Sequence, residues 1–377
     1  MVVAPSLTLW TPYSIVTTNM LPQHYQIHRP WSSDDEDDDD TAHRTGRGTA
    51  APPFHQPPLG VTGVICDTHS LLIPGWGTLQ YTVFRPRYVH MKPPLLCVAG
   101  GPYLPWQYLS TLVHLVNDRS LIFFDPVGCG QSKRITKKEE KSNESSSTNP
   151  VPQMVSDLGH LVQHLKLEHF HLFGHSFGGI VAYEALVSQK YPGKCLSLIL
   201  TSTPANIKMA MREIDELKAA LAPRGAEASL DADETVAQAF AERHECRVRP
   251  LPLQLQQSFA MAGFYSSQAS WQSTVDYVAQ PSGTSKPNIP LLLLRGEFDF
   301  ISESCMEPWR DCIQNDDSAL SESSVITLAG VAHYGMLEDE QAFGAALRTF
   351  LSSVLEPALQ IPRPAGPSVN KRSQLPR

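Results

Sequence analysis

Short, almost wholly apolar runs alternate with helical patterns through the middle of this chain. A strand that is apolar on both faces is buried on both faces, which is typical of a parallel sheet between two layers of helices. The segment 61–83 precedes the first run and predicts one or two antiparallel edge strands. The sequence therefore predicts an α/β fold with a mostly parallel central sheet, whose buried strands are residues 95–99, 120–125, 169–174, 196–201, 291–295 and 324–328.

Amphipathic helices separate these runs, and one longer helical segment interrupts them. Residues 155–165 and 341–355 repeat apolar side chains at the spacing of one helical face. Between 204 and 287 the pattern is helical and polar, with REIDELKAAL and ETVAQAFAERH as the clearest helices. An insertion at this point predicts a cap over the carboxyl ends of the strands, where open α/β sheets bind ligands. We therefore expect a core of residues 58–203 and 288–358 with a helical cap of residues 204–287.

The ends of the chain differ from the part between them. Residues 1–57 contain seven consecutive acidic residues at 34–40, and residues 359–377 are rich in proline. Low hydrophobicity and repulsion between like charges predict that both tails are disordered. The loop 133–150 is also too polar for a core, and we expect it to be mobile.

Charge and cysteine content limit the classes of partner and compartment. Most of the formal charge of −8 comes from the acidic run, so the nearly neutral body gives no reason to expect nucleic acid or an anionic membrane as partner. The seven cysteines are widely spaced and form no CxxC, which is typical of free thiols in a reducing compartment. Neither a signal-peptide pattern nor an apolar run of about 18 residues occurs. We expect a cytoplasmic protein without a membrane span.

One glycine-rich segment carries the strongest chemical signal. Residues 174–179 read GHSFGG, with an apolar strand before them and a helical pattern after them. This context is typical of a nucleophile elbow, in which a serine projects above the sheet and glycines permit close backbone contacts. Ser176 is therefore the candidate nucleophile, at a helix N-terminus that favours developing negative charge. The alternative is an ordinary glycine-rich turn with an N-cap serine.

A serine nucleophile needs a base, an acid that orients the base, and donors for the oxyanion. Asp299 follows one apolar run in GEFD and His333 follows the next in AGVAH, in the chain order expected for this elbow. Glu297 is the alternative acid. The N–H groups of Phe177, the residue after the nucleophile, and of Gly101, in the glycine loop after residues 95–99, are the predicted oxyanion-hole donors.

Other polar clusters carry weaker signals. Four histidines fall between residues 160 and 171, but neither a cysteine nor a carboxylate completes a set of zinc ligands. We therefore expect no metal. Cys246 lies two residues after His244, and we expect a helical surface pair there rather than a thiol nucleophile and its base.

These motifs together resemble the proline iminopeptidases (prolyl aminopeptidases), serine peptidases of the α/β-hydrolase fold. The resemblance covers roughly residues 60–355 and implies a helical cap, no cofactor, and release of an N-terminal residue, typically proline, through an acyl-enzyme. It implies the catalytic triad Ser176, Asp299 and His333, with Gly101 and Phe177 forming the oxyanion hole. The segments that carry it are GGPYLPWQYL at 100–109, DPVGCGQS at 125–132, GHSFGG at 174–179, FAERHECR at 240–247, GEFDF at 296–300 and GVAHYGMLED at 330–339.

Two positions differ from that family where the substrate amine is bound. The family places carboxylates in the cap and directly after the catalytic aspartate. Here Phe300 follows Asp299, and the cap position falls near Gln268. Because a buried ammonium without a carboxylate is unfavourable, Glu242 and Glu245 are the candidates to replace these groups.

Two further hypotheses stay open. The same machinery would serve an esterase or amidase for an uncharged acyl substrate, and the apolar side chains of Phe298, Phe264 and Trp271 suit such a pocket. A non-catalytic binding protein is the third reading, which the complete set of catalytic groups disfavours. The expected partner is a peptide or a small acyl substrate, and no oligomeric state is assigned. The pocket candidates are Gly100, Tyr103, Trp106, Gln268 and Phe300.

Overall fold

The computed structural model describes the chain in eight stretches: residues 63–87, 92–135, 149–189, 191–222, 230–262, 271–281, 286–314 and 325–357. The predicted disordered tails, most of the loop 133–150, Phe264 and Gln268 lie outside these stretches.

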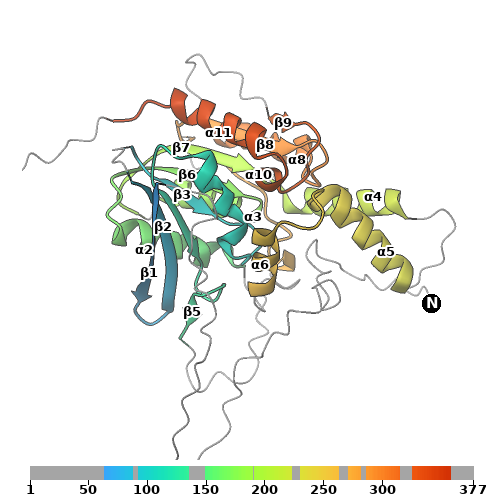
Figure 1. Cartoon of the computed structure of the whole chain (residues 1–377), viewed down its shortest axis with the longest axis horizontal. Coiled ribbons are helices and arrows are strands. Elements are labelled where there is room, and N and C mark those ends of the chain that lie inside the picture. Colours follow the sequence, from blue (N-terminus) through green and yellow to red (C-terminus); the bar gives the residue numbers. More distant parts are fainter. Residues whose placement is uncertain are drawn as a thin grey trace, which may run out of the picture.

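A central sheet forms the core, with strand order β1-β2-β4-β3-β6-β7-β8-β9 (Figure 1). The first two strands form an antiparallel hairpin, and β2 also pairs antiparallel with β4. Every later pair along this order is parallel. The predicted α/β fold with a mostly parallel sheet and an antiparallel edge is confirmed. The strands are β1 (Val64–Ile73), β2 (Gly77–Pro86), β3 (Leu95–Val98), β4 (Leu121–Asp125), β6 (His169–His175), β7 (Lys194–Thr201), β8 (Leu291–Gly296) and β9 (Ile326–Leu328).

One short strand was not expected. β5 (Lys133–Arg134) pairs with the start of β2, so the first residues of the predicted mobile loop belong to the sheet. The guanidinium of Arg134 lies 4.6 Å from the centroid of the Trp76 ring. The carbonyl of Trp76 accepts a hydrogen bond of 2.9 Å from the N–H of Ile135. A cation–π contact and backbone pairing therefore hold a segment whose composition alone suggests a loop.

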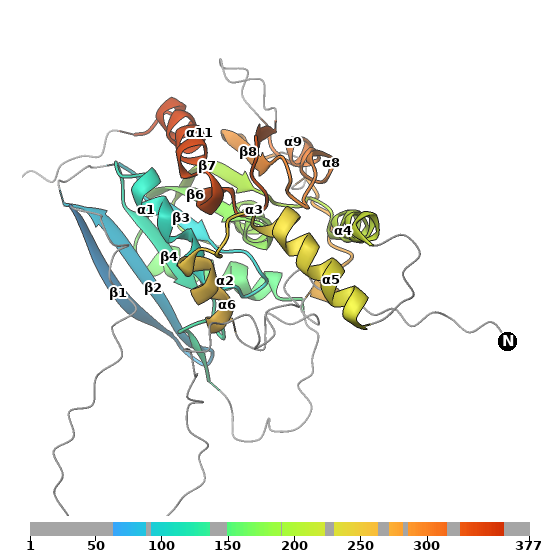
Figure 2. The ribbon, with the colours of Figure 1, turned by 45° about the vertical axis from the view of Figure 1, so that its right-hand side comes forward.

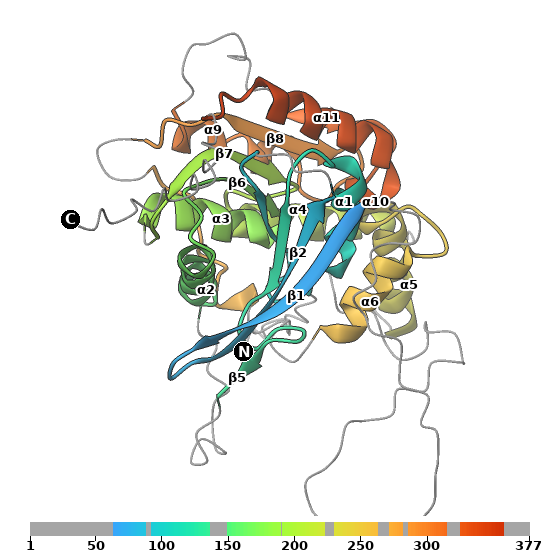
Figure 3. The ribbon, with the colours of Figure 1, turned by 60° about the vertical axis from the view of Figure 1, so that its left-hand side comes forward.

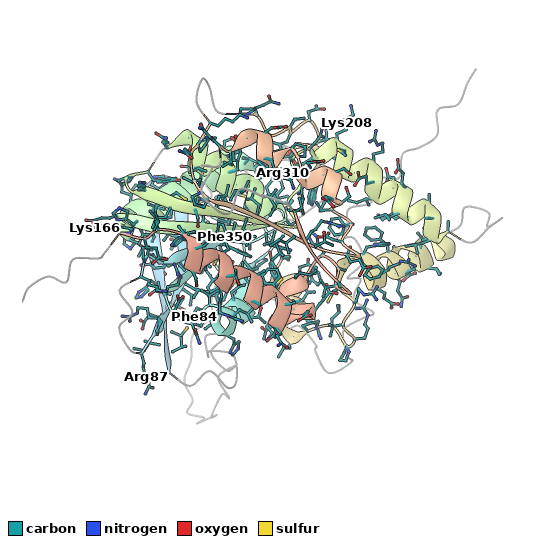
Figure 4. The ribbon with its side chains drawn as sticks, turned by 90° about the horizontal axis from the view of Figure 1, so that it is seen from above. Phe84, Arg87, Lys166, Lys208, Arg310 and Phe350 are labelled. Atoms are coloured by element: carbon teal, nitrogen blue, oxygen red, sulfur yellow. The ribbon has the colours of Figure 1, made fainter. Side chains whose placement is uncertain are left out.

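Helices cover both faces of the sheet, as Figure 3 shows. Successive strand residues point to opposite faces, so Leu96 packs in one cluster and Leu95 in the other. The first cluster contains α2 (Val151–His164) and α3 (Phe177–Ser188). The second contains α1 (Leu112–Leu115) and α11 (Glu340–Ser353), and its members Phe84 and Phe350 are labelled in Figure 4.

The predicted helical cap segment lies between β7 and β8. Figure 2 shows α4 and α5 projecting from the core on the side away from the β1–β2 hairpin. The cap elements are α4 (Ile207–Leu221), α5 (Leu230–Phe240), a π-helical turn (Ala241–Glu245) and α6 (Leu253–Met261). Short helices complete the described structure, namely a 3₁₀ helix (Trp106–Thr111), α8 (Glu303–Met306), α9 (Trp309–Cys312) and α10 (Gly335–Glu338). Across the described stretches, we find no helix with both the length and the apolar character needed to span a membrane.

Candidate active site

Ser176 occupies the sharp turn between β6 and α3. Its backbone has φ 53° and ψ −127°, a conformation that non-glycine residues rarely adopt. Its N–H donates a hydrogen bond of 2.8 Å to the carbonyl of Thr201 in the neighbouring strand. A Cβ on Gly174, Gly178 or Gly179 would collide with neighbouring atoms, which belong respectively to α3, to the end of β3 and to the segment after β7. The glycines of the motif are therefore required by close contacts around the turn.

Asp299 and His333 meet above the carboxyl ends of β8 and β9. The Nδ1 of His333 lies 2.8 Å from the Oδ1 of Asp299, and both side chains are fully buried. Burial alone would raise the pKa of Asp299, but His333, the Ser202 hydroxyl and the N–H of Ile301 hold it below its usual value. An ionised carboxylate only accepts hydrogen bonds, so His333 donates from Nδ1. In the neutral imidazole, Nε2 is then the site that can accept a proton.

The Nε2 of His333 and the Oγ of Ser176 are both buried, and neither has a hydrogen-bond partner among the described residues. His175, directly before the serine, has its ring centroid 4.7 Å from that of His333, so the base lies beside the elbow. Catalytic hydrogen bonds are often long without substrate. The alternative acid, Glu297, instead accepts the N–H of Gly330 at 2.8 Å through its Oε2.

The glycine loop after β3 lies against the nucleophile. A Cβ on Gly100 would be 3.1 Å from the Cβ of Ser176. The N–H of Gly100 donates to the Tyr108 hydroxyl at 2.7 Å, which removes it as an oxyanion donor. The N–H of Gly101 has no acceptor within the described stretches, and its φ of 126° is one that glycine tolerates. Phe177 is the first residue of α3, where an N–H has no acceptor inside the helix.

Two of the predicted pocket residues are buried and contact the core around the glycine loop. Trp106 packs in the core, with its ring centroid 4.9 Å from that of Phe123 and 6.0 Å from that of Phe84. Its assignment to the pocket stays a prediction. Tyr103 is buried, and its carbonyl accepts a hydrogen bond from the thiol of Cys129.

Aromatic rings contact the base and the residue that follows the nucleophile. The ring of Phe300 stacks on the imidazole of His333, with a centroid distance of 4.1 Å. The ring of Trp271 contacts that of Phe177 edge-on, at a centroid distance of 5.6 Å. These two contacts place apolar rings against the base and against the residue after the nucleophile.

The two candidate cap carboxylates have different environments. Glu242 is exposed and lies within 3.9 Å of the Arg249 guanidinium. Glu245 is buried, and its carbonyl accepts the N–H of His333 at 3.0 Å and of Tyr334 at 3.2 Å. Burial raises the pKa of the Glu245 side chain to about 8, while Lys218 and Arg249 oppose the shift. Its Oε1 has no hydrogen-bond partner in the described part of the chain.

The expected surface pair of His244 and Cys246 is instead buried, with 7% and 2% of each residue exposed. The N–H of Cys246 donates to the carbonyl of Ala241, five residues back, which is the bond of a π-helical turn. That wider turn directs His244 inward, where its Nδ1 lies 2.8 Å from the carbonyl of Phe298. The described residues contain no group of three or more histidine, cysteine or acidic side chains that could hold a metal ion.

Sequence reasoning did not single out Tyr108 and His175, although both lie within quoted motifs. The Tyr108 hydroxyl lies 2.8 Å from the Nδ1 of His175, and the Nε2 of His175 lies 2.9 Å from the carbonyl of His333. The sequence signal for both was their position, since Tyr108 follows the glycine loop closely and His175 directly precedes the nucleophile.

Comparison with known proteins agrees with this fold. The family model described as alpha/beta hydrolase fold matches residues 93–338. The proline iminopeptidase of Lactobacillus delbrueckii subsp. lactis is 32% identical over 146 residues, which cover 38% of this chain and 47% of that protein. The chain thus spans about half the length of the curated relatives that it matches.

Solved structures share the fold. Proline iminopeptidase of Mycobacterium smegmatis superposes with a TM-score of 0.60 at 23% identity, covering 76% of this chain and 98% of that one. VinJ superposes with a TM-score of 0.60 at 21% identity, covering 77% and 99% of the two chains. The match to the family model extends over more than half of the sequence and includes the elbow, Asp299 and His333. This chain therefore belongs to the alpha/beta hydrolase fold family.

Proposed function

We propose that this protein is a serine hydrolase that releases an N-terminal residue, typically proline, from peptides through an acyl-enzyme. The peptidase assignment rests on Glu245. Its side-chain carboxyl is buried, and its main-chain carbonyl accepts a hydrogen bond from the N–H of His333. A buried carboxyl group that lacks a hydrogen-bond partner for one oxygen, on a residue whose carbonyl accepts the N–H of the base, suits a substrate ammonium group. The relatives named proline iminopeptidase support the same substrate class.

The proposed reaction follows from the positions of five groups. The Oγ of Ser176 attacks the carbonyl carbon of the N-terminal residue, and its proton passes to the Nε2 of His333. Asp299 stabilises the resulting imidazolium through Nδ1, while the N–H groups of Gly101 and Phe177 bind the oxyanion. His333 then protonates the leaving amine. Water attacks the acyl-enzyme by the same steps, which releases the amino acid and returns the proton to Ser176.

An esterase or amidase for an uncharged acyl substrate is the second candidate. The observation that favours it is Phe300, whose apolar ring covers His333 at the position where the resemblance leads us to expect a carboxylate. An apolar wall at this point favours an uncharged acyl group over an ammonium. The two candidates share the same chemistry and differ only in the group that occupies the space near Glu245.

Three chromogenic substrates distinguish these candidates: proline p-nitroanilide, its N-acetyl derivative and p-nitrophenyl acetate. An aminopeptidase cleaves the free-amine anilide and leaves the acetylated anilide intact, because acetylation removes the charge that Glu245 binds. Cleavage of the acetylated anilide, with the free-amine compound untouched, would contradict the peptidase assignment. It would favour the esterase or amidase.

A further inference from the structure

Three hydrogen bonds connect the segments that carry the candidate active site. The N–H of Gly100 donates to the Tyr108 hydroxyl at 2.7 Å. The same hydroxyl lies 2.8 Å from the Nδ1 of His175, and the Nε2 of His175 lies 2.9 Å from the carbonyl of His333. We refer to Gly100, Tyr108, His175 and the carbonyl of His333 as the Tyr108–His175 relay.

The direction of each bond in the relay is fixed by chemistry. A carbonyl only accepts hydrogen bonds, so the Nε2 of His175 carries the proton that it donates to His333. Burial, aided by the neighbouring His333, lowers the pKa of His175 to about 3, so this ring is neutral and its Nδ1 is an acceptor. Tyr108 therefore donates its hydroxyl proton to Nδ1 and accepts the N–H of Gly100 with its oxygen. Each donor in the relay has one matching acceptor.

The relay joins three parts of the chain that are far apart in the sequence. Gly100 precedes Gly101, the proposed oxyanion donor, and His175 precedes the nucleophile. The third part is the loop that carries the base. The cap also contributes, because the N–H of Tyr108 donates to the hydroxyl of Ser258 in α6 at 2.9 Å.

We propose that Tyr108 and His175 are positioning residues for the reaction. They fix the glycine loop that contains Gly101, and the loop that carries His333, in position relative to Ser176. This inference rests on the proposed hydrolase function. Neither side chain needs to touch substrate to act in this way. A displacement of about 1 Å between reacting groups lowers rates by about 10²-fold, so a relay that fixes two loops has a measurable effect on rate.

The test measures how fast a fluorophosphonate probe labels the intact protein, because this reaction needs an activated serine and an oxyanion hole but no particular substrate. Tyr108→Phe removes the hydroxyl, and we expect labelling to slow by about 10- to 100-fold. The matched control is Tyr81→Phe, which breaks a hydrogen bond of the same kind, 3.1 Å to the Nε2 of His164, outside all three loops. We expect that control to label within about twofold of the wild-type rate.

Substitutions of His175 keep the inference testable if Tyr108→Phe does not fold. Glutamine offers a donor and an acceptor, so His175→Gln should label faster than His175→Leu, which offers neither. Adding Tyr108→Phe to His175→Leu should slow labelling no further, since both act through one relay.

The outcomes separate the relay from the proposed function. Folded Tyr108→Phe protein that labels as fast as Tyr81→Phe would overturn the relay while leaving the hydrolase proposal intact. Equal labelling of folded His175→Gln and His175→Leu at the wild-type rate would do the same. If wild-type protein does not react with the probe at all, the hydrolase proposal itself fails, and the relay fails with it.

Discussion

The ring of Phe300 stacks on the imidazole of His333, with centroids 4.1 Å apart and ring planes inclined by 24°. Phe300 follows Asp299 in the chain, so one short segment provides both the carboxylate at Nδ1 and the aromatic surface against the ring face. The ring centroid of Phe240, at the end of α5, lies 5.8 Å from the ring centroid of Phe300, so a cap residue packs near the stack. The imidazole of His333 is thus fixed by a hydrogen bond to Asp299 at its edge and by the stacked ring of Phe300 on its face.

Replacing Phe300 with leucine keeps an apolar side chain but removes the aromatic face. A cation over an aromatic ring gains about 0.5–2 kcal/mol, and His333 becomes a cation during attack. We expect kcat/KM of Phe300→Leu to fall by about 2- to 30-fold on p-nitrophenyl acetate. The control is Phe298→Leu, because the Phe298 ring contacts the Arg247 guanidinium instead. Equal losses in the two variants would contradict a specific role for the stack.

Asparagine at position 299 tests the assignment of the acid. Asp299→Asn should fold but lose activity by a factor on the order of 10⁴, because an amide does not hold the required tautomer of His333 or stabilise its cation. Glu297→Gln should retain nearly full activity, since Glu297 bonds to the N–H of Gly330. Steady-state rates of both variants decide between the acids. A severe loss in Glu297→Gln with an active Asp299→Asn would reverse the assignment.

A pH series tests Glu245 as the amine site. The pKa of Glu245 is raised to about 8, so the carboxyl is largely neutral below that pH and ionises as pH rises toward it. The measured quantity is the ratio of kcat/KM for proline p-nitroanilide to kcat/KM for p-nitrophenyl acetate, in which effects on the shared catalytic groups cancel. We expect this ratio to rise between about pH 6 and pH 7.5, below the usual α-amine pKa of about 7.7–8.0 at which the substrate loses its charge.

Two matched variants complete that measurement. Glu245→Gln should abolish the rise in the ratio, since an amide neither ionises nor pairs with an ammonium. Glu242→Gln, three residues earlier and exposed, should keep it. A rise that persists in Glu245→Gln would show that another group binds the amine.

Stability should fall as pH rises through the acidic range, because of Asp125. Burial raises the pKa of Asp125 to about 7, although the N–H groups of Gln131 and Trp106 partly oppose the shift. An unfolded aspartate has a pKa of about 3.9, so between about pH 4 and pH 7 the folded protein binds the additional proton. The free energy of unfolding then decreases with pH over this window.

Asparagine at position 125 should weaken this pH dependence. The melting temperature of Asp125→Asn should change less between about pH 5 and pH 8 than that of the wild type. Asp276→Asn, at an exposed site, should follow the wild type. Identical pH dependence in Asp125→Asn and the wild type would mean that Asp125 is not the group responsible.

Patterns with strong physical constraints were the ones predictable from sequence. Runs such as Leu291–Gly296 are apolar on both faces, and few structures other than a covered parallel strand bury them. Close backbone contacts likewise require the glycines around Ser176, so the elbow can be recognised in the sequence. Asp299 was found because it follows such a strand. His333 follows β9, an edge strand in which Ile326 and Thr327 are exposed, so the predicted burial of residues 324–328 is wrong for this strand although its position is right.

Side-chain direction after a strand or within a cap was not predictable in the same way. Trp106 lies near the glycine loop in sequence, but its 3₁₀ helix turns the indole toward Phe84 and Phe123. The π-helical turn before Cys246 adds a residue to the helical repeat, so ordinary helical spacing places His244 on the wrong face. The position of Glu245 depends on the same turn, and only the folded chain shows its carbonyl against His333.

The most direct test of the account is the identity of the acylated residue. The protein is mixed with p-nitrophenyl acetate, quenched in acid, digested and analysed by mass spectrometry of its peptides. We expect an acetyl group on Ser176 in the wild type, and neither this adduct nor ester turnover above the uncatalysed rate in Ser176→Ala. Acetylation of a different residue as the turnover intermediate, or a Ser176→Ala protein that hydrolyses the ester at the wild-type rate, would contradict it.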